Sequence, residues 1–294
     1  MINIFILNWR SVDKTKNCLK YILSSKDQNF RIVLINNFSE DSDIIELKNI
    51  YSYYKEQIEI YLVENTSNLG YAGGNNSGFR FIEEKNLSGD ILILNPDILV
   101  SSDTIGEMRK ALAYNVGIVT PRTLNTNGEI LYDAIKLTGF LQRKIVSKNT
   151  IVCSDYSQGA CMLISREVLR KVGLFDERFF LYWEEVDFSL RVREKGYKLV
   201  SVTSARVIRE KNPSVRQPLS FYYSIRNARL IKTKHPKVFS NFKYVIYLGY
   251  MLLLIFKYSF RPTYFVELWY NYFSGLRDSF RNKYYFKASV NAES

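Results

Sequence analysis

The sequence predicts an α/β protein, with a parallel sheet covered by helices on both faces and a mostly helical C-terminal segment. Short apolar runs rich in Ile, Val and Leu alternate with amphipathic stretches through residues 1–115, which is the pattern of a parallel sheet buried on both sides. The 294 residues are 47% hydrophobic, which suits a large core and excludes a disordered chain. Residues 206–294 hold 16 Lys and Arg against 4 Asp and Glu, so this segment supplies the whole net charge of +12.

The strands and helices of the first half are expected in strict alternation. The apolar runs are short and end at polar residues, whereas the stretches between them have helical periodicity. The N-terminal run is interrupted by Asn3 and lacks a basic flank, so we interpret it as the first strand and expect no secretory signal. We expect strands at 2–7, 32–35, 58–63 and 91–94, and helices near 12–24, 42–55 and 74–85.

The pattern from 116 to 205 is more mixed. Gly128 follows an asparagine, and this pair predicts a turn. A helix is expected from Glu184 to Lys195, because Gly196 then ends it. No internal repeat and no low-complexity tract appears.

The cysteines and the single histidine offer no structural zinc site. Cys18, Cys153 and Cys161 form no C-x-x-C pair, and a reducing cytosol is the simplest setting for them. His235 precedes Pro236 in a lysine-rich segment, so we expect it at the solvated surface and not in a catalytic role.

Polar residues follow each of the four predicted strands. The carboxyl ends of parallel strands meet at one edge of a sheet, where open α/β sheets bind their ligands. We therefore expect these segments to converge on one crevice. They are Asn8–Trp9, Asn36–Asn37, Glu64–Asn68 and Asn95–Asp97.

The first candidate site is Asn95-Pro96-Asp97, directly after the apolar run 91–94. A carboxylate held by a proline turn can bind a divalent cation, because Mg²⁺ uses one or two protein carboxylates together with substrate phosphates and water. The same residues are good formers of turns and helix caps, and taken alone the segment favours that reading.

The second candidate site is Glu184-Glu185-Val186-Asp187, which follows the apolar block 179–183. Partial burial behind this block would raise the pKa of a carboxylate toward that of a general base. A structural reading is equally open, since acids in the first turn complement the helix dipole and Asp187 can pair with Arg191 one turn later.

The third candidate site is the glycine-rich segment 68–78, which has four glycines in nine positions and opens a helix. Such a segment lets backbone N–H groups approach an anionic or ribosyl group closely. It matches neither the dinucleotide-binding pattern nor the Walker pattern. Serine-hydrolase chemistry is disfavoured as well, because the chain has no G-x-S-x-G.

Taken in order, six segments resemble family 2 glycosyltransferases, especially the rhamnosyltransferase-like branch. The segment 221–227 is similar to one that follows the catalytic domain in this branch. The resemblance implies a GT-A, Rossmann-like domain over residues 1–230 that binds a nucleotide-diphosphate sugar and transfers the sugar with inversion, in cell-surface polysaccharide synthesis. The six segments are 6–9, 32–39, 68–75, 94–97, 159–164 and 172–187.

The resemblance also implies roles for single residues. Glu185 stands at the place of the catalytic base and Glu184 at that of its acidic neighbour, while Asp97 stands at the position that holds Mg²⁺ or Mn²⁺. Three departures from the family pattern are Asn36 for an aspartate, Glu185 for an aspartate and Arg209 for a histidine. An arginine can bind a diphosphate but cannot ligate a metal. The expected donor-binding residues are Asn8, Asn36, Asn68, Gly70, Asn75, Asn95, Asp97 and Arg209.

The C-terminal segment 231–294 is basic and aromatic, and thirteen uncharged residues run from Tyr244 to Phe256. Thirteen residues are too few to span a bilayer, which needs about 20. The composition fits a segment that lies on an anionic membrane surface, so we expect a cytoplasmic enzyme, peripheral at the inner face of the cell membrane, that acts on a saccharide or lipid-linked acceptor. A helix buried against the catalytic domain and a helical dimer contact are the alternatives.

Two other functions compete with sugar transfer. A nucleic-acid-binding protein would suit the pI of about 9.4 and the 22 tyrosines. No RRM, KH or OB signature appears, however, so we expect no nucleic-acid partner. A catalytically inactive glycosyltransferase-like binding module is the other alternative, because Asn36 and Arg209 depart from the family pattern.

Overall fold

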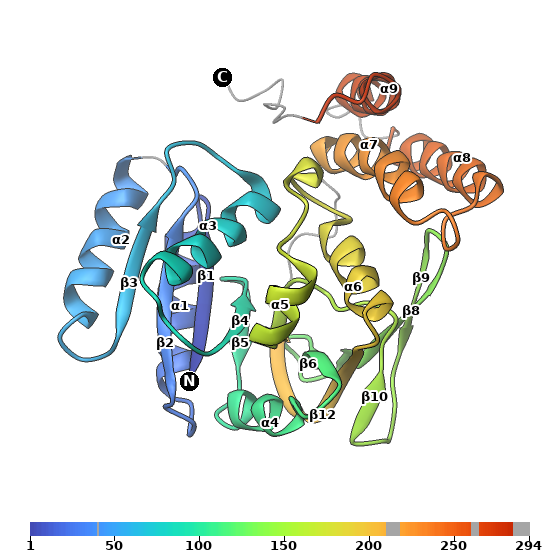
Figure 1. Cartoon of the computed structure of the whole chain (residues 1–294). Helices are drawn as coiled ribbons and strands as arrows, with labels where there is room; N and C mark the ends of the chain where they lie inside the picture. Colours follow the sequence, from blue (N-terminus) through green and yellow to red (C-terminus); the bar gives the residue numbers. More distant parts are fainter. Residues whose placement is uncertain (40, 210–217, 260–264, 285–294) are drawn as a thin grey trace.

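The computed structural model describes residues 1–39, 41–209, 218–259 and 265–284 (Figure 1). The four strands of the first half are parallel and adjacent, as predicted, in the order β3-β2-β1-β4. Asn8 pairs with Asn36 in register, and Asn36 pairs with Glu64. The predicted strand ends therefore lie side by side at one edge. The strands are β1 (Ile2–Asn8), β2 (Phe30–Asn36), β3 (Ile60–Glu64) and β4 (Asp90–Leu94).

Beyond β4 the sheet is mixed. Strand β11 (Cys161–Ile164) is antiparallel to β4 and to β6 (Val116–Leu124). Strand β12 (Lys198–Arg209) is parallel to β6 and antiparallel to β5 (Ile98–Val100). Strand β10 (Ile151–Cys153) pairs with β12 at the edge of the sheet opposite to β3, and β7 (Ile130–Tyr132) pairs with β6 outside the main strand order. The amide of Gly128 donates to the carbonyl of Asn125 at 3.0 Å, which confirms the predicted turn between β6 and β7.

Helices cover both faces of the sheet, as predicted. Successive strand residues point to opposite faces, so Ile4 packs with one set of helices and Phe5 with the other. The first set is α1 (Val12–Leu23), α2 (Asp41–Tyr54) and α4 (Thr104–Ala111). The second set is α3 (Gly70–Glu84), α5 (Arg166–Val172) and α6 (Glu184–Glu194).

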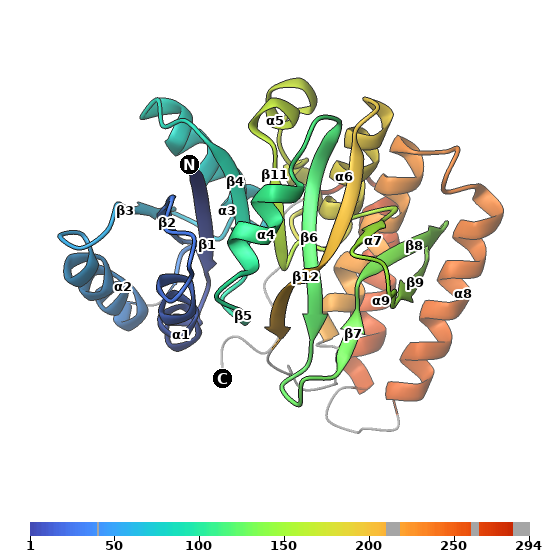
Figure 2. The ribbon, with the colours of Figure 1, turned by 90° about the horizontal axis from the view of Figure 1, so that it is seen from below.

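The C-terminal segment is helical and packs beside α6, on the flank opposite to α2 (Figures 1 and 2). Its helices share an aromatic core with Trp183 and with the hairpin of β8 (Ala134–Thr138) and β9 (Leu141–Ile145). The proposed boundary at residue 230 falls inside the first of these helices. They are α7 (Pro218–Lys234), α8 (Asn241–Tyr258) and α9 (Phe265–Phe280).

No helix within the described ranges is long and apolar enough to cross a membrane. In α8, one side of the apolar run 244–256 packs on the protein through Tyr244, Tyr247, Met251 and Ile255. The last part of the predicted C-terminal segment, residues 285–294, lies outside the described residues.

Candidate functional site

A cavity of about 680 Å³ opens between the carboxyl ends of the sheet strands, the start of α6 and the C-terminal helices. Of the predicted site residues, it is lined by Asn95, Glu184, Glu185 and Arg209. The structure therefore brings together the acidic residues of α6, the end of β4 and the end of β12. Asn8, Asn36, Asn68, Gly70, Asn75 and Asp97 do not line it.

The two carboxylates of α6 enter this cavity from the first turn of the helix. Trp183, the residue before the helix, has a left-handed backbone with φ 76°, which starts α6 abruptly after the apolar block. The side chain of Glu184 is 3% exposed. One oxygen of each carboxyl, Oε2, is buried and has no hydrogen-bond partner among the residues that the structure describes. These two oxygens are acceptors available to a ligand.

Burial controls the ionisation of this pair. It raises the pKa of Glu184 well above its usual range, and the neighbouring carboxyl of Glu185 raises it further. Burial also raises the pKa of Glu185, whereas a hydrogen bond from Glu184 lowers it. We infer that Glu184 holds a proton in the pH range where Glu185 is already ionised. The predicted shift toward general-base behaviour is thus present in direction.

We expect the stability of the protein to fall as pH rises through the range where Glu184 keeps its proton only in the folded state. The pKa of Glu184 is raised by folding, so the unfolded chain loses this proton first, and ionisation then favours unfolding. Glu184→Gln should flatten this dependence, by about 1.4 kcal/mol for each pH unit that separates the folded from the unfolded pKa. Urea unfolding at about pH 5 and pH 8 measures it. Glu56→Gln, at an exposed carboxylate, should leave the dependence unchanged, and an unchanged slope in Glu184→Gln would contradict the expectation.

Asp97 and Arg209 meet at the edge of the cavity. The segment Asn95–Ile98 forms the predicted turn, because the amide of Ile98 donates to the carbonyl of Asn95 at 3.1 Å. Arg209 pairs in register with Ile98 across β5 and β12, which places its Nε 3.5 Å from Oδ2 of Asp97. A partly exposed guanidinium thus stands next to the one predicted metal-binding carboxylate.

The residues at this edge suit a divalent cation held mainly by a substrate. Asp97 supplies one carboxylate and Asn95 an amide oxygen, which fits the low protein share that Mg²⁺ needs when phosphates supply other ligands. Within the described ranges, no cluster of three or more His, Cys, Asp or Glu could hold a metal ion. The chain's own ligand set is therefore partial.

The asparagines at the strand ends form hydrogen bonds within the chain, to the loops and helices that follow the strands. Oδ1 of Asn8 accepts from the hydroxyl of Thr15 at 2.8 Å, and Oδ1 of Asn36 accepts from the amide of Ser39 at 3.1 Å. Nδ2 of Asn37 donates to Oδ1 of Asn68 and to the carbonyl of Gly70, both at 3.0 Å. These amides shape the loops after β1, β2 and β3, so their predicted contact with a donor nucleotide stays a prediction.

The glycine-rich segment makes a close contact within the chain. Gly70 has φ +68°, and a Cβ there would overlap the carbonyl oxygen of Phe180. The amide of Tyr71 donates to that same carbonyl at 2.7 Å, and the amide of Ala72 does so at 3.3 Å. The first amides of α3 thus bind the loop before α6, where the sequence suggested that such amides approach an anion. Asn75 lies in the interior of α3, where its Nδ2 donates to the carbonyl of Tyr71 at 2.9 Å.

Several cavity residues were missed from the sequence. Tyr71 is partly buried, and its hydroxyl donates to the carbonyl of Gly159. The removal of this hydroxyl from solvent raises its pKa well above the usual value, and the nearby Glu184 adds to the effect. Tyr156 and Gln158 come from the loop before β11, and Tyr247 comes from α8. Aromatic side chains at such positions are indistinguishable from core residues in a single sequence.

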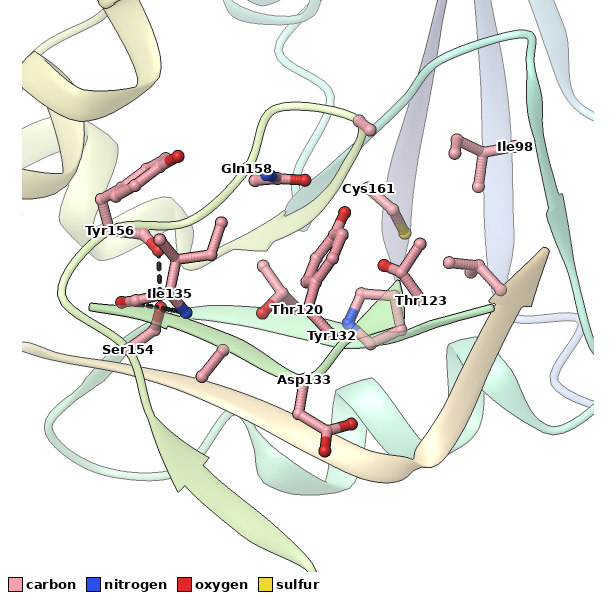
Figure 3. A pocket seen from close by; sticks show the side chains of 14 residues that line it. Ile98, Thr120, Thr123, Tyr132, Asp133, Ile135, Ser154, Tyr156, Gln158 and Cys161 are labelled. Carbon is pink, nitrogen blue, oxygen red and sulfur yellow. Dashed lines mark hydrogen bonds between the residues drawn. The ribbon is translucent and has the colours of Figure 1, made fainter. Parts of the chain in front are cut away.

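Figure 3 shows the lining of a much smaller cavity, of about 10 Å³, which shares Tyr156 and Gln158 with the large one. Tyr132, Thr120 and Cys161 line its interior. This volume holds about one water molecule at most, so the small cavity has no room for a substrate.

The prediction of a solvated His235 is wrong. Its side chain is buried, with Nε2 2.9 Å from Oδ1 of Asp187 and Nδ1 3.3 Å from Oε1 of Glu194. The residue directly follows α7, which packs beside α6 and so carries the imidazole inward. Burial acts to raise the pKa of Asp187. Its three partners His235, Arg191 and Lys234 outweigh this effect and lower the pKa below its usual value. Asp187 is therefore a structural anchor of α6, and its predicted pairing with Arg191 is present at 2.9 Å.

The loop before α6 is held by α7. Nη2 of Arg226 donates to the carbonyl of Phe179 at 2.7 Å. Nδ2 of Asn227 lies 2.8 Å from the carbonyl oxygens of Phe179, Leu181 and Tyr182. Both side chains are fully buried. They fix a loop with left-handed residues at 180, 182 and 183, and this loop sets where α6 begins.

A family model described as "Glycosyltransferase like family 2" matches residues 6–227, about three quarters of the chain. The matched range contains every predicted site residue. It ends inside α7 at Asn227, so it includes both side chains that hold the loop before α6.

Two curated relatives are similar over much of this range. A low-salt glycan biosynthesis hexosyltransferase of Haloferax volcanii is 28% identical over 67% of this chain and 63% of its own length. An N-acetylglucosaminyl-diphospho-decaprenol L-rhamnosyltransferase of Mycobacterium tuberculosis is 25% identical over 55% of this chain and 62% of its own. The chain thus spans less than two thirds of the length of these two relatives.

A solved mannosyltransferase of Pyrobaculum calidifontis, in complex with GDP-Man and Mn²⁺, has the same fold. It superposes with a TM-score of 0.61 at 12% identity, over 96% of this chain and 87% of its own. Together with the mixed sheet and its two helical layers, this likeness shows a GT-A fold with a helical C-terminal portion.

Proposed function

We propose a function from the premise that this chain belongs to the family 2 glycosyltransferases and is similar to their rhamnosyltransferases: it transfers a sugar from a nucleotide-diphosphate donor to an acceptor hydroxyl, with inversion at the anomeric carbon. One observation carries the proposal. The large cavity places the half-buried Glu185, with an unpartnered carboxylate oxygen, in the same space as Arg209 and Asn95. Glu185, as a base for the acceptor hydroxyl, and the guanidinium of Arg209, as a positive charge for the leaving diphosphate, then share one site.

In this mechanism the carboxylate of Glu185 takes the proton of the acceptor hydroxyl. The hydroxyl oxygen forms a bond to the anomeric carbon from the face opposite the diphosphate, and the bond from that carbon to the diphosphate oxygen breaks. The guanidinium of Arg209 can pair with the charge that develops on the leaving diphosphate. A bound Mg²⁺ or Mn²⁺, held by Asp97 and the diphosphate, would add to this neutralisation.

The names of the relatives suggest the substrates. Because the mycobacterial relative is named as a rhamnosyltransferase that acts on a diphospho-decaprenol saccharide, we propose a saccharide or lipid-linked saccharide as the acceptor and dTDP-rhamnose as the donor to test first. Such an enzyme would serve cell-surface polysaccharide synthesis. Its place would be the cytoplasmic face of the cell membrane, where nucleotide sugars and lipid-linked acceptors meet.

Nucleotide binding tests the proposal directly. We expect one of UDP, dTDP, GDP and CMP to raise the melting temperature in the presence of Mg²⁺ or Mn²⁺. A nucleotide present at 100 times its dissociation constant stabilises the folded protein by about 2.7 kcal/mol. Asp97→Ala should remove most of the metal-dependent part, because Asp97 is the carboxylate at this edge. Differential scanning fluorimetry measures both.

The matched control is Asp103→Ala, which removes an exposed carboxylate paired with Lys26 and should leave the nucleotide shift intact. A shift that is equal in Asp97→Ala and the wild type would reject Asp97 as the metal position. No shift with any nucleotide would reject the donor site and favour an inactive binding module.

A further inference from the structure

Helix α8 has two apolar sides, and the protein covers one of them. On the inner side Tyr247 and Met251 line the large cavity, next to Trp183 and the β8–β9 hairpin. Phe140 of this hairpin stacks on Tyr247 with ring centroids 4.7 Å apart. The C-terminal segment therefore supplies a wall of the proposed active site.

The outer side of α8 is equally apolar and faces outward. Phe242, Val245, Ile246, Leu252 and Leu253 are exposed, with 66% of Val245 and 71% of Leu253 accessible. Between Lys243 and Lys257 the helix carries no charge. A helix that is apolar all round is normally buried on every side. Yet α8 forms the outer edge in both views, with no described helix or strand beyond it (Figures 1 and 2).

Helix α9 adds a second apolar stripe. Val266 and Phe273 lie on its exposed side, and Arg277 follows one turn later on the same side. The described residues from 218 onward contain two acids, Glu267 and Asp278, and Asp278 is buried. Exposed cations of this region are Lys237, Lys257, Arg277, Arg281 and Lys283.

We propose that the outer sides of α8 and α9 dock on the surface of an anionic lipid bilayer. Apolar side chains bordered by Lys and Arg suit acyl chains beneath negatively charged headgroups. Among the described residues from 218 onward no exposed carboxylate neutralises these cations, and Arg277 pairs with the buried Asp278. A second copy of the chain suits these outer sides less. A symmetric dimer through this face would bring the same cations against one another, with no exposed acid opposite them.

The docked orientation also defines how the acceptor reaches the site. Tyr250 is partly exposed on α8 and lines the cavity, so the bilayer surface and the cavity mouth share this helix. A lipid-linked acceptor in that bilayer would keep its chain among the lipids and present its saccharide beside Tyr250. This part of the inference rests on the proposed sugar transfer, whereas the docking itself does not.

Vesicle co-sedimentation of the full chain tests the docking. We expect binding to vesicles of phosphatidylcholine and phosphatidylglycerol in equal parts, weaker binding to phosphatidylcholine alone, and a decrease with added salt. The double variant Val245→Glu and Leu253→Glu should lose about tenfold or more of this binding. Both positions are exposed, so the variant should fold.

The matched control is Ile45→Glu with Tyr53→Glu, which changes two exposed apolar residues of α2 and should bind vesicles like the wild type. Failure of the wild type to bind anionic vesicles would overturn the proposal, as would equal loss in both double variants. A wild-type dimer that the α8 variant dissociates, without vesicle binding, would assign the face to a second copy and overturn it too.

The nucleotide shift separates this inference from the proposed function. A wild type that binds vesicles but shows no shift with any nucleotide supports the docking and rejects the sugar transfer. An α8 variant that keeps the wild-type melting temperature and nucleotide shift, and loses only vesicle binding, supports both.

Discussion

Glu185→Gln is expected to lower kcat for sugar transfer by about 100-fold to 10,000-fold, the range in which a general base contributes. Gln keeps the shape and hydrogen-bonding capacity of the side chain but cannot accept the proton of the acceptor hydroxyl. The loss should therefore fall on the chemical step. Donor binding, measured as the nucleotide-induced rise in melting temperature, should remain, because the diphosphate is proposed to bind Arg209 and a metal ion held by Asp97.

The pH profile gives a second readout of the same residue. The fraction of ionised Glu185 increases with pH, so kcat should rise through the pKa of this residue and then level off. Because burial raises that pKa, the rise should lie at a higher pH than for an exposed glutamate. Glu184→Gln is the matched control. Its amide can still donate a hydrogen bond to Glu185, so we expect most of the activity and the same rising limb.

Two results would reject this assignment. A Glu185→Gln variant with wild-type kcat would show that another group takes the proton, and a larger loss in Glu184→Gln would move the base to that residue. The product must also carry the inverted anomeric configuration, which NMR of the transferred sugar reports. A retained configuration would exclude the single displacement on which the role of Glu185 depends.

The first half of the fold could be predicted because its pattern is local. Strands such as 2–8 and 30–36 are apolar runs that are too short for a buried helix, so the sequence indicates strands there. Helix α6 begins and ends within one residue of the range expected from its acids and Gly196. The mixed half was not predictable in the same way. Strand β11 lies between β4 and β6, two strands that both come well before it in the chain, and no local pattern encodes such an insertion.

The site divides along the same line. Asn95, Glu184 and Glu185 were found from the sequence because each ends or begins a recognisable element, and Arg209 was identified through the family resemblance; all four line the cavity. The part that was missed depends on tertiary contacts.

Gly70 illustrates this limit. A glycine beside a helix start suggests an anion site, but here the close approach is to the carbonyl of Phe180. The burial of His235 likewise follows from the docking of α7 on α6, and nothing in its lysine-rich surroundings encodes it.

The second large effect is expected where α7 holds the loop before α6. Replacing Asn227 with Asp changes only an NH₂ group into an oxygen, so the size of the side chain is kept. This new oxygen would face the carbonyl oxygens of Phe179, Leu181 and Tyr182, which now lie 2.8 Å from a donor. The carbonyl of Phe179 would keep Arg226 as a donor, whereas those of Leu181 and Tyr182 would lose theirs. A carbonyl shielded from water and left without a donor costs about 1–3 kcal/mol, and a buried carboxylate facing such carbonyls costs more.

We therefore expect Asn227→Asp to destabilise the protein by at least about 3 kcal/mol, a fall in melting temperature on the order of 10 °C for a chain of this size. Thermal unfolding followed by circular dichroism measures it. Asn241→Asp is the matched control, because Asn241 is exposed and accepts from Lys232 at 2.7 Å through an oxygen that the acid keeps. Equal melting temperatures for the two variants would show that the loop holds its shape without Asn227. If the loop does depend on it, kcat should fall together with stability, since the same three carbonyls fix the turn from which Glu185 enters the cavity.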